Sequence, residues 1–142
     1  MLKVGIVGIG FMGWVHWLSY KNVKGVQVVA ICETDPAKQE GDWTSIQGNF
    51  GPPGEQVDLT NVEVFDNLDA MLSDCELDLV DICLPPSMHC EATLKSLDYG
   101  KHVFCEKPMA VALKDCDQMV AAAERNHRLL FVGHVLPFFP EY

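Results

Sequence analysis

A short glycine-rich stretch near the start of the chain has the residue types and the spacing to bind phosphate. Gly8, Gly10 and Gly13 form a G-x-G-x-x-G pattern between an apolar run and an amphipathic segment. The first glycine permits a tight turn, the second lets backbone approach a pyrophosphate, and the third allows a helix to pack closely on a strand. The N–H groups and positive dipole end of that helix would then face the phosphates. We predict dinucleotide contacts from Gly8, Ile9, Gly10, Phe11, Met12 and Gly13.

Glu33 stands twenty positions after Gly13, at the end of a second β-branched run. An acid at this distance hydrogen-bonds the ribose hydroxyls of a bound dinucleotide. A 2′-phosphate at the same place would meet an anion, and Thr34 brings no compensating positive charge. The pattern therefore favours NAD over NADP, unless an arginine from elsewhere reaches the site. For the glycines alone, an ordinary strand-to-helix turn is the alternative interpretation.

The spacing of apolar residues predicts the elements that must position these groups. Near-continuous apolar strands that alternate with helices are typical of a parallel sheet covered on both faces. We therefore predict an α/β fold with a doubly wound parallel sheet of about six strands, the Rossmann fold. Strands are expected at residues 4–7, 26–31, 62–65, 77–84, 101–105 and 129–132, and helices at residues 12–22, 68–72, 87–99 and 113–126.

Sheets of this kind bind ligands at the carboxyl ends of their strands. That rule adds the residues after the fourth, fifth and sixth predicted strands to the glycine loop and Glu33. These additional candidates are Leu84, Pro85, His89, Glu106, Lys107 and His134. We expect all of these loops to meet at one edge of the sheet.

Residues 41–61 interrupt the regular pattern with many Gly, Pro, Asn and Asp residues, including Gly51-Pro52-Pro53-Gly54. The composition predicts a long irregular connection. Loops of this length are often functional or mobile. The favoured interpretation is an insertion at the sheet edge, to which the sequence assigns no task.

Bulk composition excludes several classes of function. The chain of 142 residues suits one domain, and its net charge of -10 argues against nonspecific binding of nucleic acid or of anionic membranes. The six cysteines include no C-x-x-C pair, which favours free thiols in a reducing compartment. The first 18 residues are broken by glycines and lack a small-residue cleavage site, so we expect a cytoplasmic protein.

Three sequence blocks together resemble one enzyme family. They are residues 8–13, residues 81–85 with His89, and the run Gly100-Lys101-His102-Val103-Phe104-Cys105-Glu106-Lys107-Pro108, which is the most specific. The chain resembles the N-terminal half of the Gfo/Idh/MocA family over essentially its whole length. The resemblance implies an NAD(P)-dependent oxidoreductase that transfers hydride between nicotinamide and a sugar, a polyol or a related carbonyl compound.

The same resemblance implies roles for individual residues. Lys107 matches the family lysine beside the nicotinamide and the reacting oxygen, and is the predicted catalytic residue. Glu106 would orient backbone and ribose contacts, and the bond before Pro108 is often cis in the family. His89 has two open interpretations, as a residue near the cofactor pocket or as a satisfied helix histidine. From their positions, His16 and His127 are expected to be solvated, His102 structural, and no histidine pair to bind metal.

The chain also departs from the family pattern. Pro86 stands where many members have Asn, and residues 134–140 contain no arginine, so transferred substrate contacts are in doubt. His134 is a candidate polar group in that region. We expect residues 1–133 to form the dinucleotide-binding domain and residues 134–142 to begin the connection to a second domain.

That second domain would supply much of the substrate pocket and the surface for a homo-oligomer. The 142-residue piece alone is therefore expected to be inactive. Two other functions are compatible with the sequence. One is a non-catalytic NAD-binding module that reports redox state to a protein partner, and the other is a Rossmann domain for a different ligand such as S-adenosylmethionine.

Overall fold

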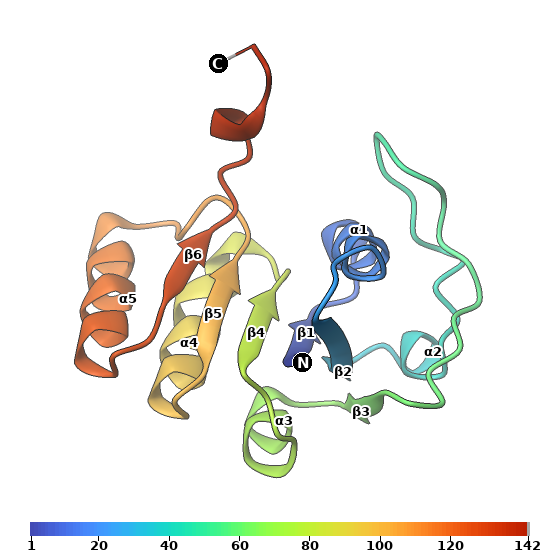
Figure 1. The fold of residues 1–142 in the computed structure, drawn as a ribbon, viewed down its shortest axis with the longest axis horizontal. Helices are drawn as coiled ribbons and strands as arrows, with labels where there is room; N and C mark the ends of the chain where they lie inside the picture. The colour runs from blue at the N-terminus through green and yellow to red at the C-terminus, as the bar shows by residue number, and fades with distance from the viewer. Residues whose placement is uncertain (142) are drawn as a thin grey trace.

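A computed structural model describes residues 1–141 of the chain, so Tyr142, the last residue of the predicted connection, lies outside the described residues. The fold is a parallel six-stranded sheet in the order β3-β2-β1-β4-β5-β6 with helices on both sides (Figure 1). The strands are β1 Leu2–Val7, β2 Val26–Cys32, β3 Glu63–Phe65, β4 Leu79–Ile82, β5 His102–Cys105 and β6 Leu130–Val132. The helices are α1 Phe11–Tyr20, α2 Pro36–Gln39, α3 Leu68–Asp74, α4 Pro86–Asp98 and α5 Leu113–Arg125, followed by the 3-10 turn Leu136–Phe138.

The predicted doubly wound sheet is thereby confirmed. The chain reverses direction in the sheet between β1 and β4, which pair with Ile6 opposite Asp81. Ligands of such sheets bind in the crevice outside this switch point. The fold therefore presents the loops after β1 and β4 to a common site.

Short side chains set several helix boundaries. The Asp35 carboxylate caps α2 by accepting a 3.0 Å hydrogen bond from Ala37, and Asn67 caps α3 by accepting a 2.8 Å bond from Ala70. These caps satisfy N–H groups that have no partner within the helix. Gly100 follows α4 with φ of +73°, a left-handed conformation that ends helices and favours glycine.

Two apolar cores lie on the opposite faces of the sheet. Residues of α3, α4 and α5 pack one face, around Met71, Leu97 and Met119. The other face is covered by α1, with Trp14 and Trp17 at its centre. Burial on both faces explains why the central strands contain almost only apolar residues.

The irregular segment 41–61 runs beside α1 and belongs to the second core (Figure 1). Trp43 is fully buried, with its ring centroid 5.1 Å from that of Trp17 and 5.9 Å from that of Trp14. The indole N–H of Trp14 donates to the carbonyl of Pro52 at 3.0 Å. The segment therefore forms a packed cover for α1 and contains no strand apart from an isolated bridge between Asp42 and Gln56.

Within residues 1–141, every helix is too short or too polar to cross a lipid bilayer.

Candidate functional site

A cleft of about 680 Å³ lies at the carboxyl ends of β1, β2 and β4. The glycine loop and α1 form one wall, and the β4–α4 loop forms the opposite wall. Of the predicted cofactor contacts, Gly8, Ile9, Gly10, Phe11, Met12, Glu33, Leu84 and Pro85 line this cleft. Its far rim includes residues that the sequence did not single out, namely Asp66, Asn67, Leu68, Met88, Glu91 and Lys95.

The glycine loop has the geometry that close approach of a phosphate requires. Gly8 has φ of +89°, and a Cβ added at Gly10 would meet no atom within 4 Å, so the backbone there faces open space. No side chain caps the N-terminus of α1, and no acidic residue lies in its first turn. The helix therefore begins with free N–H groups at its positive dipole end, which favour an anion.

Gly13 has a different role in the same loop. A Cβ at this position would lie 2.2 Å from the carbonyl oxygen of Gly8. Only a residue without a side chain allows α1 to lie this close to the end of β1. Gly13 thus fixes the approach of the helix to the sheet and does not itself line the cleft.

Glu33 ties the end of β2 to the glycine loop. One carboxylate oxygen accepts the Ile9 N–H at 2.8 Å, and the other accepts the N–H groups of Thr34 at 2.7 Å and Asp35 at 3.0 Å. A carboxylate has about four acceptor positions, so a further bond to a hydroxyl group is possible. The residues present thus fit a dinucleotide, with N–H groups for phosphate and a carboxylate for ribose.

Glu106, Lys107 and His89 lie outside the cleft lining, on the side of β5. The Lys107 side chain is exposed, and its backbone N–H donates to the Glu106 carboxylate at 3.0 Å. The bond between Lys107 and Pro108 is cis. The predicted catalytic loop follows β5, which neighbours β4 in the sheet, so it lies beside the cleft. Its residues do not line the cleft.

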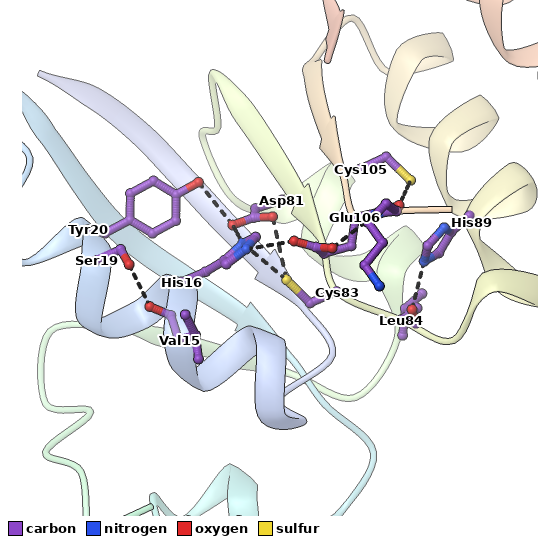
Figure 2. Close-up of polar contacts among 11 residues, drawn as sticks. Val15, His16, Ser19, Tyr20, Asp81, Cys83, Leu84, His89, Cys105 and Glu106 are labelled. Carbon is purple, nitrogen blue, oxygen red and sulfur yellow. Dashed lines mark hydrogen bonds and ion pairs between the residues drawn. The ribbon is translucent and has the colours of Figure 1, made fainter. Parts of the chain in front are cut away.

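His89 is buried, and Figure 2 shows its contact with Leu84. Its Nδ1 lies 2.8 Å from the Pro108 carbonyl oxygen, and its Nε2 lies 2.7 Å from the Leu84 carbonyl oxygen. Because carbonyl oxygens only accept hydrogen bonds, a neutral His89 ring donates to one of these two oxygens through its single N–H group. His89 thus joins the cleft wall at Leu84 to the loop that carries Lys107.

The expectation that His16 is solvated is wrong. The His16 side chain is only 14% exposed and points from α1 into a group of polar side chains (Figure 2). Its Nδ1 lies 2.8 Å from the Asp81 carboxylate and its Nε2 lies 3.0 Å from the Glu106 carboxylate. Tyr20, one turn further along α1, donates to the same Asp81 oxygen at 2.9 Å. We call these four residues the His16 bridge.

The contacts of the bridge favour a protonated His16 ring. Both carboxylates accept hydrogen bonds, so a neutral imidazole would leave one ring nitrogen facing an oxygen without a proton between them. Burial lowers the pKa of His16, but hydrogen bonds to Asp81, Cys83 and Glu106 outweigh it and raise this pKa to about 12. Burial raises the pKa of the Glu106 carboxyl, yet hydrogen bonds from His16 and the Lys107 amide bring it below its ordinary value. The raised pKa thus keeps the His16 ring an imidazolium between the two carboxyl groups.

Cys83 is adjacent to the bridge and lines the cleft. Its sulfur lies 3.4 Å from His16 Nδ1 and 3.5 Å from Asp81. Burial raises the pKa of the Cys83 thiol to about 12, so it remains a weak donor. One side-chain atom each of His16, Asp81 and Cys83 could bind a metal ion, and these three atoms lie within 4.8 Å of one another. Hydrogen bonds, however, already occupy both nitrogens of the His16 ring. We therefore interpret the cluster as a hydrogen-bonded ion bridge.

The bridge predicts a pH-dependent contribution to stability. His16 gains its high pKa only on folding, so its contribution is complete below the unfolded pKa of 6.5 and is lost as pH rises toward about 12. Over that interval the contribution falls by up to about 1.4 kcal/mol per pH unit. The difference in thermal midpoint between the wild-type domain and its His16→Gln variant should shrink by roughly 3 to 6 °C per pH unit from about pH 7 to 9. A constant difference over this range would show that His16 carries no charge.

Comparisons with known proteins agree with this architecture. A family model described as "Oxidoreductase family, NAD-binding Rossmann fold", that of Gfo/Idh/MocA, matches residues 2–134. Inositol 2-dehydrogenase of Salmonella paratyphi B is 31% identical over 136 residues, which are 93% of this chain and 36% of the relative. A 2,7-anhydro-N-acetylneuraminate hydratase of Mediterraneibacter gnavus is 29% identical over 134 residues, 94% of this chain and 32% of the relative.

Solved structures show the same likeness. The WlbA dehydrogenase from Chromobacterium violaceum, in complex with NADH and UDP-GlcNAcA, superimposes with a TM-score of 0.78 at 26% identity. The match covers 92% of this chain and 34% of that one. The chain thus spans about a third of the length of the relatives it matches. It belongs to the Gfo/Idh/MocA oxidoreductase family, of which it carries the NAD-binding Rossmann domain.

Proposed function

We propose that this chain binds NAD in the cleft and forms the nucleotide-binding part of a dehydrogenase for a sugar, a polyol or a related carbonyl compound. The observation that carries the proposal is the N-terminus of α1, which no side chain caps. The backbone at Gly10, just before this helix, faces open space, and the Glu33 carboxylate lies beside it. The cleft volume of about 680 Å³ is in the range of cofactor sites. The relatives support the substrate class. Two of them are named for inositol and for a neuraminate, and the WlbA structure contains UDP-GlcNAcA.

The charges around the cleft favour NAD over NADP. Glu33, Asp66 and Glu91 are anionic residues of the lining. Among the described residues of the lining, the only cation is Lys95, which already pairs with Asp69 at 2.9 Å and with Glu91 at 3.3 Å. A 2′-phosphate would therefore add negative charge to an anionic rim without a free cation to meet it.

We propose that Lys107 transfers the proton of the substrate oxygen. Bound NAD supplies the acceptor for hydride from the substrate carbon. The Lys107 side chain is exposed and its backbone N–H is held by Glu106. As a neutral amine it would accept the hydroxyl proton while hydride leaves the substrate carbon, and as an ammonium it would return that proton in the reverse reaction. His89 and Glu106 would hold the loop, while Leu84 and Pro85 would form the wall beside the cofactor.

A cofactor titration tests this function without knowledge of the substrate. Adding NADH to the full-length protein should give a saturable fluorescence change, whereas NADPH should bind at least about tenfold more weakly, a difference of about 1.4 kcal/mol. Thr34→Arg, which places a cation beside Glu33, should reduce that preference. Failure of NADH to saturate at millimolar concentration would contradict the proposal, and equal affinities would contradict the preference for NAD.

A further inference from the structure

The His16 bridge connects the helix behind the glycine loop to the loop that carries Lys107. His16 belongs to α1, Asp81 to β4, and Glu106 directly follows β5. Figure 2 shows the His16 ring between the two carboxylates, with Tyr20 reaching the same Asp81 from the next turn of α1. The three elements that would contact a bound dinucleotide are thus joined through one ring.

The surroundings of the bridge make it stiff. Asp81 is fully buried and Glu106 is only 5% exposed, so neither carboxylate is well solvated. The Phe104 ring lies edge-on to His16 with centroids 5.4 Å apart, and a Cβ at Gly133 would come within 3.1 Å of the Glu106 carboxylate. Buried charges of this kind are costly unless they are paired, and removing one partner leaves the others uncompensated.

Glu106 passes this constraint to Lys107. One of its oxygens accepts from His16, and the other accepts the backbone N–H of Lys107 at 3.0 Å. The Glu106 backbone N–H donates to the Ile82 carbonyl at 3.0 Å, which anchors the same residue to β4. The position of the Lys107 backbone therefore depends on where the Glu106 carboxylate is held.

We propose that His16 is a positioning residue, which as an imidazolium between Asp81 and Glu106 holds the Glu106–Lys107 turn against the cofactor-binding helix. The inference rests on the proposed function, because that function gives the turn its place beside the nicotinamide end of the cofactor. His16 itself touches neither cofactor nor substrate in this role. Misplacement of a reacting group by about 1 Å can cost on the order of a hundredfold in rate, so such a bridge has a direct catalytic consequence.

The test compares the two ends of the cofactor in the full-length protein. His16→Gln should leave the affinity for ADP-ribose, which lacks nicotinamide, within about twofold of the wild-type value. It should weaken NADH binding by roughly fivefold and reduce the fluorescence change of bound NADH, since only the nicotinamide end loses its support. Hydrogen exchange at the amides of residues 105–110 should become about tenfold faster, while that of α4 is unchanged.

Two further variants make the test specific. Glu106→Gln should reproduce the His16→Gln phenotype, and the double variant should add less than about twofold, because both changes break one bridge. His127→Asn is the matched control, since His127 is exposed and its φ of 52° is tolerated by asparagine. It should behave as wild type.

The outcomes separate the inference from the function on which it rests. Wild-type protein that does not bind NADH would contradict the proposed function. If wild-type protein binds NADH but His16→Gln loses the same factor of affinity for ADP-ribose and for NADH, the positioning role is overturned. Unchanged hydrogen exchange at residues 105–110 in this variant would also overturn it. A uniform rise in exchange across the sheet would also overturn it, because the bridge would then contribute only to global stability.

Discussion

Lys107→Met in the full-length protein is expected to lower turnover by about 10²- to 10⁴-fold, the usual contribution of a positioned acid or base. The methionine side chain keeps most of the lysine's length and volume but has no nitrogen to accept or donate a proton. NADH affinity should change by less than about threefold, because Lys107 lies outside the cleft lining. Steady-state kinetics with NAD and a panel of sugars and polyols, alongside NADH titration, measures both quantities.

Lys24→Met provides the control for this experiment. Lys24 is also exposed, but it lies just before β2, at the amino end of this strand and thus at the edge of the sheet opposite the strand-end loops. Its replacement should leave both kinetics and binding unchanged. If Lys107→Met retained full turnover, the catalytic role would be lost. Retained NADH binding with an unchanged biological output would then favour a module that signals redox state to a partner.

Gly13→Ala should destabilise the domain by about 3 kcal/mol or more, which is a large part of the stability of an ordinary domain. The added methyl group would lie 2.2 Å from the Gly8 carbonyl oxygen, so backbone must move. The thermal midpoint of the unit containing this helix should fall by roughly 10 °C. Thermal denaturation followed by circular dichroism measures the change.

Gly10→Ala is the matched comparison, because a Cβ at Gly10 would meet nothing within 4 Å and the residue has an extended backbone. Its stability should stay within about 0.5 kcal/mol of the wild-type value. Affinity for NADH should nevertheless fall at least about tenfold, since the methyl group would occupy the space of the pyrophosphate. Equal stability of the two variants would contradict the roles assigned to these glycines.

The order of elements was predictable because periodicity depends only on the neighbours in the chain. The run from Leu77 to Leu84 predicts a buried strand, and β4 spans Leu79–Ile82 inside it. Likewise, the helix predicted at residues 68–72 is observed as α3, and Asn67 just before it accepts the hydrogen bond from Ala70. The ends of the strands differ from the prediction by a few residues, because pairing with neighbouring strands sets them.

The His16 bridge was not predicted because its partners are 65 and 90 residues away in the chain. One signal was present: Asp81 is a charged residue in the middle of an apolar parallel strand. Such a carboxylate needs a buried partner. His16 and Tyr20, one helical turn apart beside the glycine loop, were available to supply it.

Two other features that were not predicted also depend on contacts between residues far apart in the chain. Trp43 occurs in a stretch whose glycines and prolines predict only a loop, yet it is fully buried against α1. Asp66, Asn67 and Lys95 line the cleft because the β3–α3 turn and α4 meet at its far rim. Neither relation has a signature in local sequence.

The aromatic packing of α1 also determines what can be observed optically. Trp14, Trp17 and Trp43 are the chain's three tryptophans, and all belong to the same apolar cluster. Tryptophan emission from this domain therefore originates on a single face of the sheet, and α4 and α5 on the other face contain no tryptophan. The emission overlaps the absorption of reduced nicotinamide, so energy transfer from these indoles provides a built-in reporter of occupancy that needs no added dye.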